Sequence, residues 1–357
     1  MSLRDRLTAL IAAGGPISVA QYMTACLHDP NDGYYATRPA IGEDGDFITA
    51  PMISQMFGEL IGVWAAAAWE LMGQPDTLRL IEMGPGDGTL MDDILRTLRH
   101  APGFLEAADV WLVETSPPLR ALQADRLGER VRWAATLAEI PDGAPLILVA
   151  NELLDCLPAR QFVRTAIGWA EQVVGLDGEG ELAFGLAATP VGALLPDAAP
   201  GQVFEQSAAQ AALGAELGAR IAADGGAALL IDYGRAEPGF GDTLQALRRH
   251  EKVDPLWNPG EADLTVHADF PAVMAAARAE GCEAALLTQT DFLARMGIGA
   301  RAEALVRAAP RRSGTIGRQL TRLIGADEMG ELFKVCALHS PDWTPPAFEN
   351  LSVLEDA

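Results

Sequence analysis

The hydrophobic residues of this chain occur in short strand-like runs, each followed by a segment with helical spacing. Residues 78–83 form such a run, and apolar side chains recur at helical spacing through residues 89–98. A nearly continuous apolar run is typical of a parallel strand whose two faces are both covered by helices. The pattern therefore predicts an α/β fold with a Rossmann-like central sheet. Further strands are expected at residues 110–114, 131–133, 145–150, 225–231, 286–290 and 332–338.

The first part of the chain is expected to be helical. Ser2 and Ser18 stand where helix N-caps are favoured, and residues 53–72 carry the apolar stripe of a longer helix. Before that helix, residues 42–51 form a long loop of low apolar content, and such loops are uncommon in compact domains unless they bind something. We therefore expect residues 1–75 to form an N-terminal helical region with a loop that covers the site.

Residues 76–357 are expected to form the core, with insertions at about residues 160–205 and 291–325. The first insertion alternates apolar and polar side chains around Asp177 and Gly178, which predicts an antiparallel hairpin inserted into the sheet. The second insertion has helical spacing and several arginines. Its basic face either contacts a partner or is simply solvated.

Charge and cysteine content exclude several kinds of site and partner. The 357 residues carry a net charge of −23, which disfavours nucleic acid as a ligand. The four cysteines are scattered without C-x-x-C spacing, so we expect no metal site and no disulfide framework, and a reducing cytoplasm in a bacterium. No apolar run reaches the length of a membrane span, so no membrane insertion is expected.

A glycine-rich turn follows the strand at residues 78–83. Gly84, Gly86 and Gly88 let the backbone turn sharply and approach a ligand closely, because glycine has no Cβ. The helix that follows would direct its first amides at that ligand. A dinucleotide fingerprint would place its third glycine one residue later, and the acid Glu82 would repel a pyrophosphate. A turn that only joins strand to helix remains the alternative.

Acidic and amide side chains stand at further strand ends. Glu114 closes the second strand, 26 residues after Gly88, where an acid can accept hydrogen bonds from both hydroxyls of a ribose. Asn151 and Glu152 follow the fourth strand, with Asp155 shortly behind them. Because the carboxyl ends of the strands face the ligand crevice in an open α/β sheet, we expect these side chains near the reacting groups. A solvated strand-end acid or a helix cap is the plainer interpretation of each.

Five separated pieces of the chain resemble one family. The glycine turn with its preceding acid resembles motif I of class I S-adenosylmethionine (SAM) methyltransferases. With four other pieces it is similar to the MidA family, whose mitochondrial members are arginine methyltransferases needed for the assembly of respiratory complex I. The resemblance departs at Met52, where an acid is expected, and at Asp87, where the mitochondrial members carry a basic residue. The five pieces are residues 45–51 with 53–59, 82–90, 151–158, 262–265 and 329–334.

The resemblance implies a class I SAM methyltransferase fold, SAM as cofactor and a protein arginine as acceptor, with a respiratory complex I subunit as partner. Carboxylates grip a guanidinium through paired hydrogen bonds, so Glu152 is the first catalytic candidate, with Asp155 and Asp46 for a second clamp. Asp232 is a further candidate. The residues expected to hold SAM are Glu82, Gly84, Gly86, Gly88, Thr89, Glu114, Asn151, Thr49 and Gln55.

Two other functions are compatible with the same residues. An assembly chaperone with a SAM fold would bind a respiratory subunit without turnover. A small-molecule methyltransferase would share the cofactor site but not the acceptor. The sequence leaves the oligomeric state open.

Overall fold

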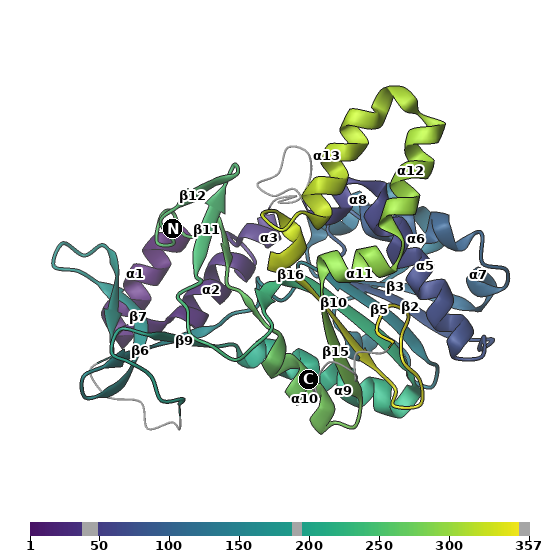
Figure 1. Ribbon diagram of the computed structural model, residues 1–357. Helices are drawn as coiled ribbons and strands as arrows, with labels where there is room; N and C mark the ends of the chain where they lie inside the picture. Colours follow the sequence, from purple (N-terminus) through teal and green to yellow (C-terminus); the bar gives the residue numbers. More distant parts are fainter. Residues whose placement is uncertain (38–48, 188–194, 350–357) are drawn as a thin grey trace.

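The central feature is a mostly parallel sheet with helices on both faces (Figure 1). The computed structural model describes residues 1–37, 49–187 and 195–349. In spatial order the sheet holds β4 (Arg132–Ala134), β3 (Ala108–Val113), β2 (Leu78–Met83), β5 (Leu146–Asn151), β10 (Gly226–Arg235), β16 (Phe333–His339) and β15 (Glu283–Thr288). The last strand among the described residues, β16, is antiparallel to both of its neighbours, and the pairs from β4 to β10 are parallel. The Rossmann-like α/β prediction is confirmed.

Apolar side chains fix which helices cover which face of this sheet. All six residues of β5 are buried, because successive side chains point to opposite faces and both faces are packed. Ile147 and Val149 share one core with α5 (Gln55–Leu71) and α6 (Thr89–Leu98). Leu146 and Leu148 share the opposite core with α9 (Ala208–Asp224) and α10 (Phe270–Ala279). The other helices of this body are α4 (Ala50–Ile53), α7 (Phe104–Ala107), α8 (Pro117–Leu127), α11 (Gln289–Arg295), α12 (Ile298–Ala308), α13 (Ser313–Ile324) and α14 (Met329–Leu332).

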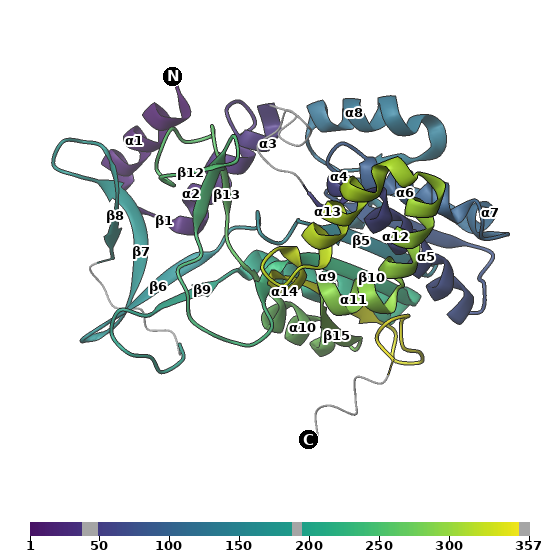
Figure 2. The same cartoon turned by 45° about the horizontal axis from the view of Figure 1, so that its top comes forward.

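A second lobe lies beside the sheet (Figure 2). Its helices are α1 (Leu3–Gly14), α2 (Val19–His28) and α3 (Tyr34–Thr37), and Ser2 and Ser18 form the N-cap hydrogen bonds of the first two, as predicted. One antiparallel sheet of the lobe holds β1 (Ile17–Ser18), β6 (Arg160–Thr165), β7 (Gly168–Leu176), β8 (Leu182–Leu186) and β9 (Val203–Gln206). A smaller sheet holds β11 (Gln245–Arg248), β12 (Glu251–Val253) and β13 (Asp263–Thr265).

The hairpin expected around Asp177 and Gly178 is present as β7 and β8, but it does not extend the central sheet. Strand β7 pairs instead with β1 from the beginning of the chain, where Ile17 lies opposite Val174. Both residues are buried in the core of the lobe, so the inserted strands follow α1 and α2 rather than the Rossmann-like sheet.

The buried contacts group the N-terminal helices in two ways. Helices α1 and α2 share the core of the lobe with the inserted strands, whereas α5 shares a core with the central sheet. All three helices lie before residue 76, in the stretch expected to form one N-terminal helical region. Where the chain divides into domains remains a prediction.

All four cysteines are buried and free. Cys26 and Cys156 lie in the core of the lobe, and Cys282 and Cys336 lie in the core between the central sheet and helices α9 and α10. Among the described helices, none combines the length and the apolar content that a membrane crossing requires.

Two glycines allow α9 and α10 to pack backbone to backbone. A Cβ built on Gly214 would lie 2.5 Å from the carbonyl oxygen of Val273, and one on Gly218 would lie 2.5 Å from that of Ala277. Contacts this short do not occur for real Cβ atoms, so the close approach of the two helices requires glycine at both positions.

We predict that Gly218→Ala lowers the free energy of unfolding by about 1–3 kcal/mol, because the added methyl group overpacks this interface. The same change in a helix with open space stabilises by about 0.5–1 kcal/mol, because glycine is a poor helix residue. Gly317 of α13 is the matched control, since a Cβ there has nothing within 4 Å. Urea unfolding of both variants measures the two signs, and a stabilised Gly218→Ala would contradict the described packing.

Candidate active site

The carboxyl ends of β2, β3 and β5 surround a cavity with two adjoining parts. The larger part, of about 310 Å³, lies against the loop that follows β3. The smaller part, of about 40 Å³, lies beside the start of α6. Gly84, Gly86 and Glu152 line both parts, so the two adjoin at the glycine turn. The larger volume lies in the range of about 300–1,000 Å³ that is typical of small-molecule sites.

The three glycines of the turn serve different purposes. Gly84, Gly86 and Gly88 have positive φ angles of 66°, 54° and 81°, a conformation that favours glycine. Gly84 and Gly86 line the cavity, whereas a Cβ on Gly88 would lie 3.2 Å from Leu127 of α8. Gly88 therefore shapes the turn and the packing of α8, and it lines neither part of the cavity.

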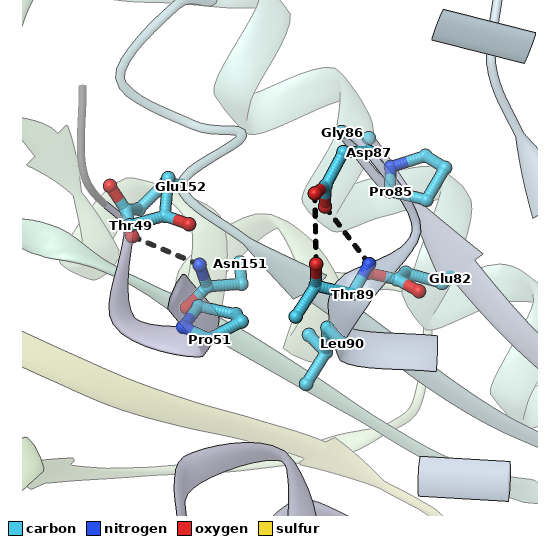
Figure 3. Close-up of a pocket in the computed structure, with 11 residues that line it drawn as sticks. Thr49, Pro51, Glu82, Pro85, Gly86, Asp87, Thr89, Leu90, Asn151 and Glu152 are labelled. Carbon is cyan, nitrogen blue, oxygen red and sulfur yellow. Dashed lines mark hydrogen bonds between the residues drawn. The ribbon is translucent and has the colours of Figure 1, made fainter. Parts of the chain in front are cut away.

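Asp87 and Thr89 hold the turn in place. Asp87 Oδ1 accepts a hydrogen bond of 3.0 Å from the backbone N–H of Thr89, and its Oδ2 accepts one of 2.9 Å from the Thr89 hydroxyl (Figure 3). Arg126 of α8 also forms a salt bridge of 2.8 Å with Asp87. Arg126 therefore offsets the negative charge of Asp87, the residue at which this chain departs from the family pattern. Thr89 lines the smaller part of the cavity.

Two buried oxygen atoms beside the smaller part have no hydrogen-bond partner among the described residues. They are Oε2 of Glu82 and Oδ1 of Asn151, and both residues line the cavity (Figure 3). Burial raises the pKa of Glu82 to about 8, and the charges of Asp87 and Glu114 add to this rise. A buried acceptor without a donor costs free energy, so a ligand that brings N–H donors or positive charge fits here.

Glu114 lies in the larger part, and its carboxylate is held by the chain. Oε1 accepts a hydrogen bond of 2.7 Å from the N–H of Ser116, and Oε2 accepts one of 3.2 Å from the side-chain amide of Gln123. The same amide donates to the carbonyl of Gly86 at 2.7 Å, which ties the acid to the glycine turn. Burial raises the pKa of Glu114, and these hydrogen bonds oppose the rise. The fixed carboxylate keeps lone pairs that can accept two hydroxyl hydrogens.

Glu152 lies where the two parts meet. It follows β5 directly and has a φ of 52°, a left-handed conformation that costs a non-glycine residue free energy and is often found at functional sites. Its Oε1 accepts a hydrogen bond of 3.1 Å from the N–H of Ala50. The same oxygen accepts one of 3.0 Å from the side-chain amide of Asn151 (Figure 3). Burial raises the pKa of Glu152 to about 7, with a further rise from the charge of Asp155. The carboxyl group is thus fixed, and near neutral pH it can either hold or accept a proton.

Asp155 and Asp232 lie behind this surface and line neither part of the cavity. Asp232 accepts hydrogen bonds from the backbone N–H groups of Leu154 at 2.8 Å and Asp155 at 3.1 Å, so it caps the turn after β5. Asp155 Oδ2 accepts a hydrogen bond of 2.7 Å from the hydroxyl of Tyr233. Burial raises the pKa of Asp155 to about 6 and that of Asp232 well above its usual range. Both acids support the loop that begins with Glu152, and the structure does not bring Asp155 into the cavity as a second clamp.

The segment before α5 contributes unequally to the site. Thr49 and Pro51 line the smaller part of the cavity, next to Glu152 (Figure 3). Gln55 is exposed, donates to Glu59 at 3.1 Å and lines neither part, so it is not brought to the expected cofactor site. Asp46 lies outside the described residues.

Sequence reasoning missed an aromatic wall of the larger part. The rings of His28 and Tyr35 line it and stack with their centroids 6.0 Å apart. The carbonyl of Tyr35 accepts a 2.6 Å hydrogen bond from the Ser116 hydroxyl, and its own hydroxyl donates to Asp263 at 2.9 Å. The only signal in the sequence is a pair of tyrosines after a turn, which does not identify a ligand. Apolar side chains complete this part of the cavity, namely Met83, Val113, Leu119, Leu153 and Leu157.

These walls fit the parts of SAM one by one. The aromatic and apolar side chains suit a nucleobase, and Glu114 suits the two hydroxyls of a ribose. The unpartnered oxygens of Glu82 and Asn151 suit the ammonium group. Glu152, between the two parts, adds negative charge near the place for a sulfonium.

Comparisons with known proteins agree with this fit. The family model described as "Putative S-adenosyl-L-methionine-dependent methyltransferase" matches residues 60–288. The mitochondrial protein arginine methyltransferase NDUFAF7 of Danio rerio is 36% identical over 93% of this chain and 86% of its own length. Its counterpart in Homo sapiens is 36% identical over 92% of this chain and 81% of its own length.

A solved structure agrees as well. A Burkholderia thailandensis protein with bound S-adenosyl-homocysteine superposes with a TM-score of 0.85 at 30% identity, covering 98% of this chain and 94% of that one. The resemblance to the MidA family is thereby confirmed. With a family model that matches most of its length and relatives that cover more than nine-tenths of it, the chain belongs to this family of SAM-dependent methyltransferases.

Proposed function

We propose that this methyltransferase transfers the methyl group of SAM to a guanidinium nitrogen of an arginine in a protein. The observation that carries the proposal is Glu152, a fixed and buried carboxyl group at the junction of the two cavity parts, with a pKa raised to about 7 by burial. The relatives named as protein arginine methyltransferases support this acceptor.

The chemistry of a guanidinium requires such a group. A guanidinium is always protonated in water and is a poor nucleophile, but its planar N–H groups form paired hydrogen bonds with a carboxylate. When bound, SAM supplies an electrophilic methyl group on a positively charged sulfur. Glu152 would orient one nitrogen toward that methyl group and accept the proton that this nitrogen loses on methylation. Asp155 and Asp232 would act as positioning residues behind it, and Asp46 stays the candidate for a second clamp.

A chaperone that binds its partner without turnover is the alternative. Gly84→Val separates the two functions, because Gly84 has a φ of 66° and a Cβ there would lie 3.0 Å from Leu153. Cells that carry this variant and keep full function without SAM binding would favour the chaperone. Methylation of a small molecule is distinguished by the fate of the label, which would then stay out of protein.

The partner and the compartment are part of the same proposal. We propose a respiratory complex subunit as the acceptor, supported by the mitochondrial relatives. We propose a bacterial cytoplasm as the location, supported by the similar protein of Burkholderia thailandensis. Four buried cysteines without a disulfide suit a reducing compartment.

We predict that Glu152→Gln slows methyl transfer to protein by about 10²–10⁴-fold, because the amide keeps the shape of the side chain but cannot accept a proton. Labelled SAM and a bacterial lysate measure the rate, and hydrolysis of the labelled protein identifies methylarginine. Glu106→Gln on the exposed surface of α7 is the matched control and should keep the rate. Undiminished labelling in Glu152→Gln would contradict the assigned role.

We predict that SAM binding near pH 7 releases close to one proton from Glu82. The pKa of this buried carboxyl is about 8 in the free protein, so it holds a proton at pH 7, and an ammonium group beside it favours the ionised form. Calorimetry in two buffers with different ionisation enthalpies measures the release. The release should fall in Glu82→Gln to the smaller contribution of Glu152, whose pKa is about 7, and it should persist in full in Glu106→Gln. Equal heats in both buffers for the unaltered protein would contradict the prediction.

A further inference from the structure

The second insertion concentrates positive charge in a strongly acidic chain. Residues 291–325 contain seven of the 26 Lys and Arg residues but two of the 49 Asp and Glu residues. This segment therefore carries a net charge of +5, and the rest of the chain carries −28. The segment forms α11, α12 and α13, and the last two make a helical hairpin that projects beside the central sheet (Figures 1 and 2).

Most of these arginines are available to a partner. Arg311, Arg312, Arg318 and Arg322 are exposed, and none forms a salt bridge with a carboxylate of the described residues. Arg301 differs, because its guanidinium donates to both oxygens of Glu59 at 2.6 and 2.8 Å and anchors α12 to α5. The hairpin is thus fixed at its base, while the charges along α13 remain free to pair.

A groove of about 780 Å³ runs between α13 and α4. Arg318 and Arg322 line one wall, and Met52 and Ile53 line the other. Gln319 holds the walls together by donating to the carbonyl of Ile53 at 2.6 Å. Gly317 also lines the groove, and a Cβ there would have nothing within 4 Å, so the space beside it is open. Glu328 is the one acid among the described lining residues, so the groove is predominantly positive.

The groove reaches the active site through one short stretch of chain. Met52 and Ile53 line the groove, and Thr49 and Pro51, one to four residues earlier, line the smaller part of the cavity. The charge of Arg322 also acts at the site. Burial dominates the raised pKa of Glu152, but the charge of Arg322 lowers it.

We propose that this groove binds the acceptor protein beside the target arginine, and that the acceptor carries acidic residues there. The proposal rests on the proposed function and adds the sequence context of the substrate. Acids in the cavity suit the arginine, and arginines of α13 suit carboxylates next to it. The residues lining the groove and those lining the cavity are at most four positions apart between Thr49 and Ile53, so the acidic residues should lie within about five positions of the arginine. Nucleic acid suits the groove less well, because the surrounding chain carries −28.

Two synthetic peptides test the proposal with the full-length protein and SAM. Both have a central arginine, and one carries glutamates three and four residues to each side where the other carries glutamines. We expect a KM about three- to tenfold lower for the acidic peptide, with kcat unchanged, and a loss of this advantage at high salt. Arg318→Glu should abolish the preference, and lysines in place of the glutamates should restore tight binding to that variant.

Arg307→Glu is the matched control. Arg307 is exposed on α12, pairs with Glu303 and does not line the groove, so the same change of charge there should leave the preference intact. Fluorescence anisotropy of the labelled peptides, with S-adenosylhomocysteine present, gives a readout that does not depend on turnover.

The outcomes separate this proposal from the proposed function. Preferential binding of the acidic peptide without methylation would support the groove and overturn the arginine acceptor. Methylation of both peptides with equal KM, unaffected by Arg318→Glu, would support the acceptor and overturn the groove. A single-stranded oligonucleotide that displaces the acidic peptide and binds more tightly would assign the groove to nucleic acid and also overturn the proposal.

Discussion

The desolvation of carboxyl groups at the edge of a parallel sheet is the constraint on which this active site depends. Strands β2 and β5 are covered on both faces by apolar side chains. Polar side chains therefore reach the cavity from the carboxyl ends of the strands. Glu82, Glu114 and Glu152 converge there and are poorly solvated, which raises the pKa of each. Because these values exceed those of an unfolded chain, the three acids destabilise the native state as the pH rises from about 4.5 through their folded values. A cationic cofactor and a cationic acceptor offset that cost, so the same charges serve binding and chemistry.

The surroundings of the cavity are tied to it by contacts between distant parts of the chain. Tyr35 connects the second lobe to the loop after β3 through Ser116, and to β13 through Asp263. On the other side, Glu59 of α5 accepts hydrogen bonds from Arg96 of α6 and Arg301 of α12. The helix that follows the glycine turn and the basic hairpin are therefore fastened to one buried carboxylate. Polar contacts therefore connect the ligand site with both the lobe and the hairpin, in addition to the apolar core that α12 and α13 share with the central sheet.

The sequence predicted those features that depend on neighbouring residues. The apolar run at residues 78–83 coincides with β2, and the turn at Asp177 and Gly178 joins β7 to β8. Features that depend on distant partners were not predictable in this way. Gln55 turns toward Glu59, which belongs to a cluster completed by Arg301, 242 residues from that acid. Likewise, periodicity shows that a strand has one buried face but not which sheet it joins, so the placement of β7 beside β1 could not be read from its alternation.

The residues of the candidate site also fall into those that local sequence predicts and those that tertiary contacts place. Residues that end a strand or form the glycine turn, such as Gly84, Glu114 and Glu152, lie at the cavity as expected. Asp155 was placed there by sequence proximity, but Tyr233 holds it behind the surface from 78 positions away along the chain. The wall formed by His28 and Tyr35 comes from a lobe that no local pattern connects to the sheet. Residues close together in the sequence were therefore sufficient to predict the strand-end acids and the glycine turn. The positions of Asp155, His28 and Tyr35 depend on tertiary packing and could not be predicted in this way.

The distribution of the four buried thiols has a practical consequence. Cys26 and Cys156 lie in one packing unit and Cys282 and Cys336 in another, and burial raises the pKa of all four thiols. An alkylating reagent attacks only a thiolate that it can reach. The chain thus carries an intrinsic pair of probes in each half, and the order in which they are alkylated during denaturation would reveal which half opens first.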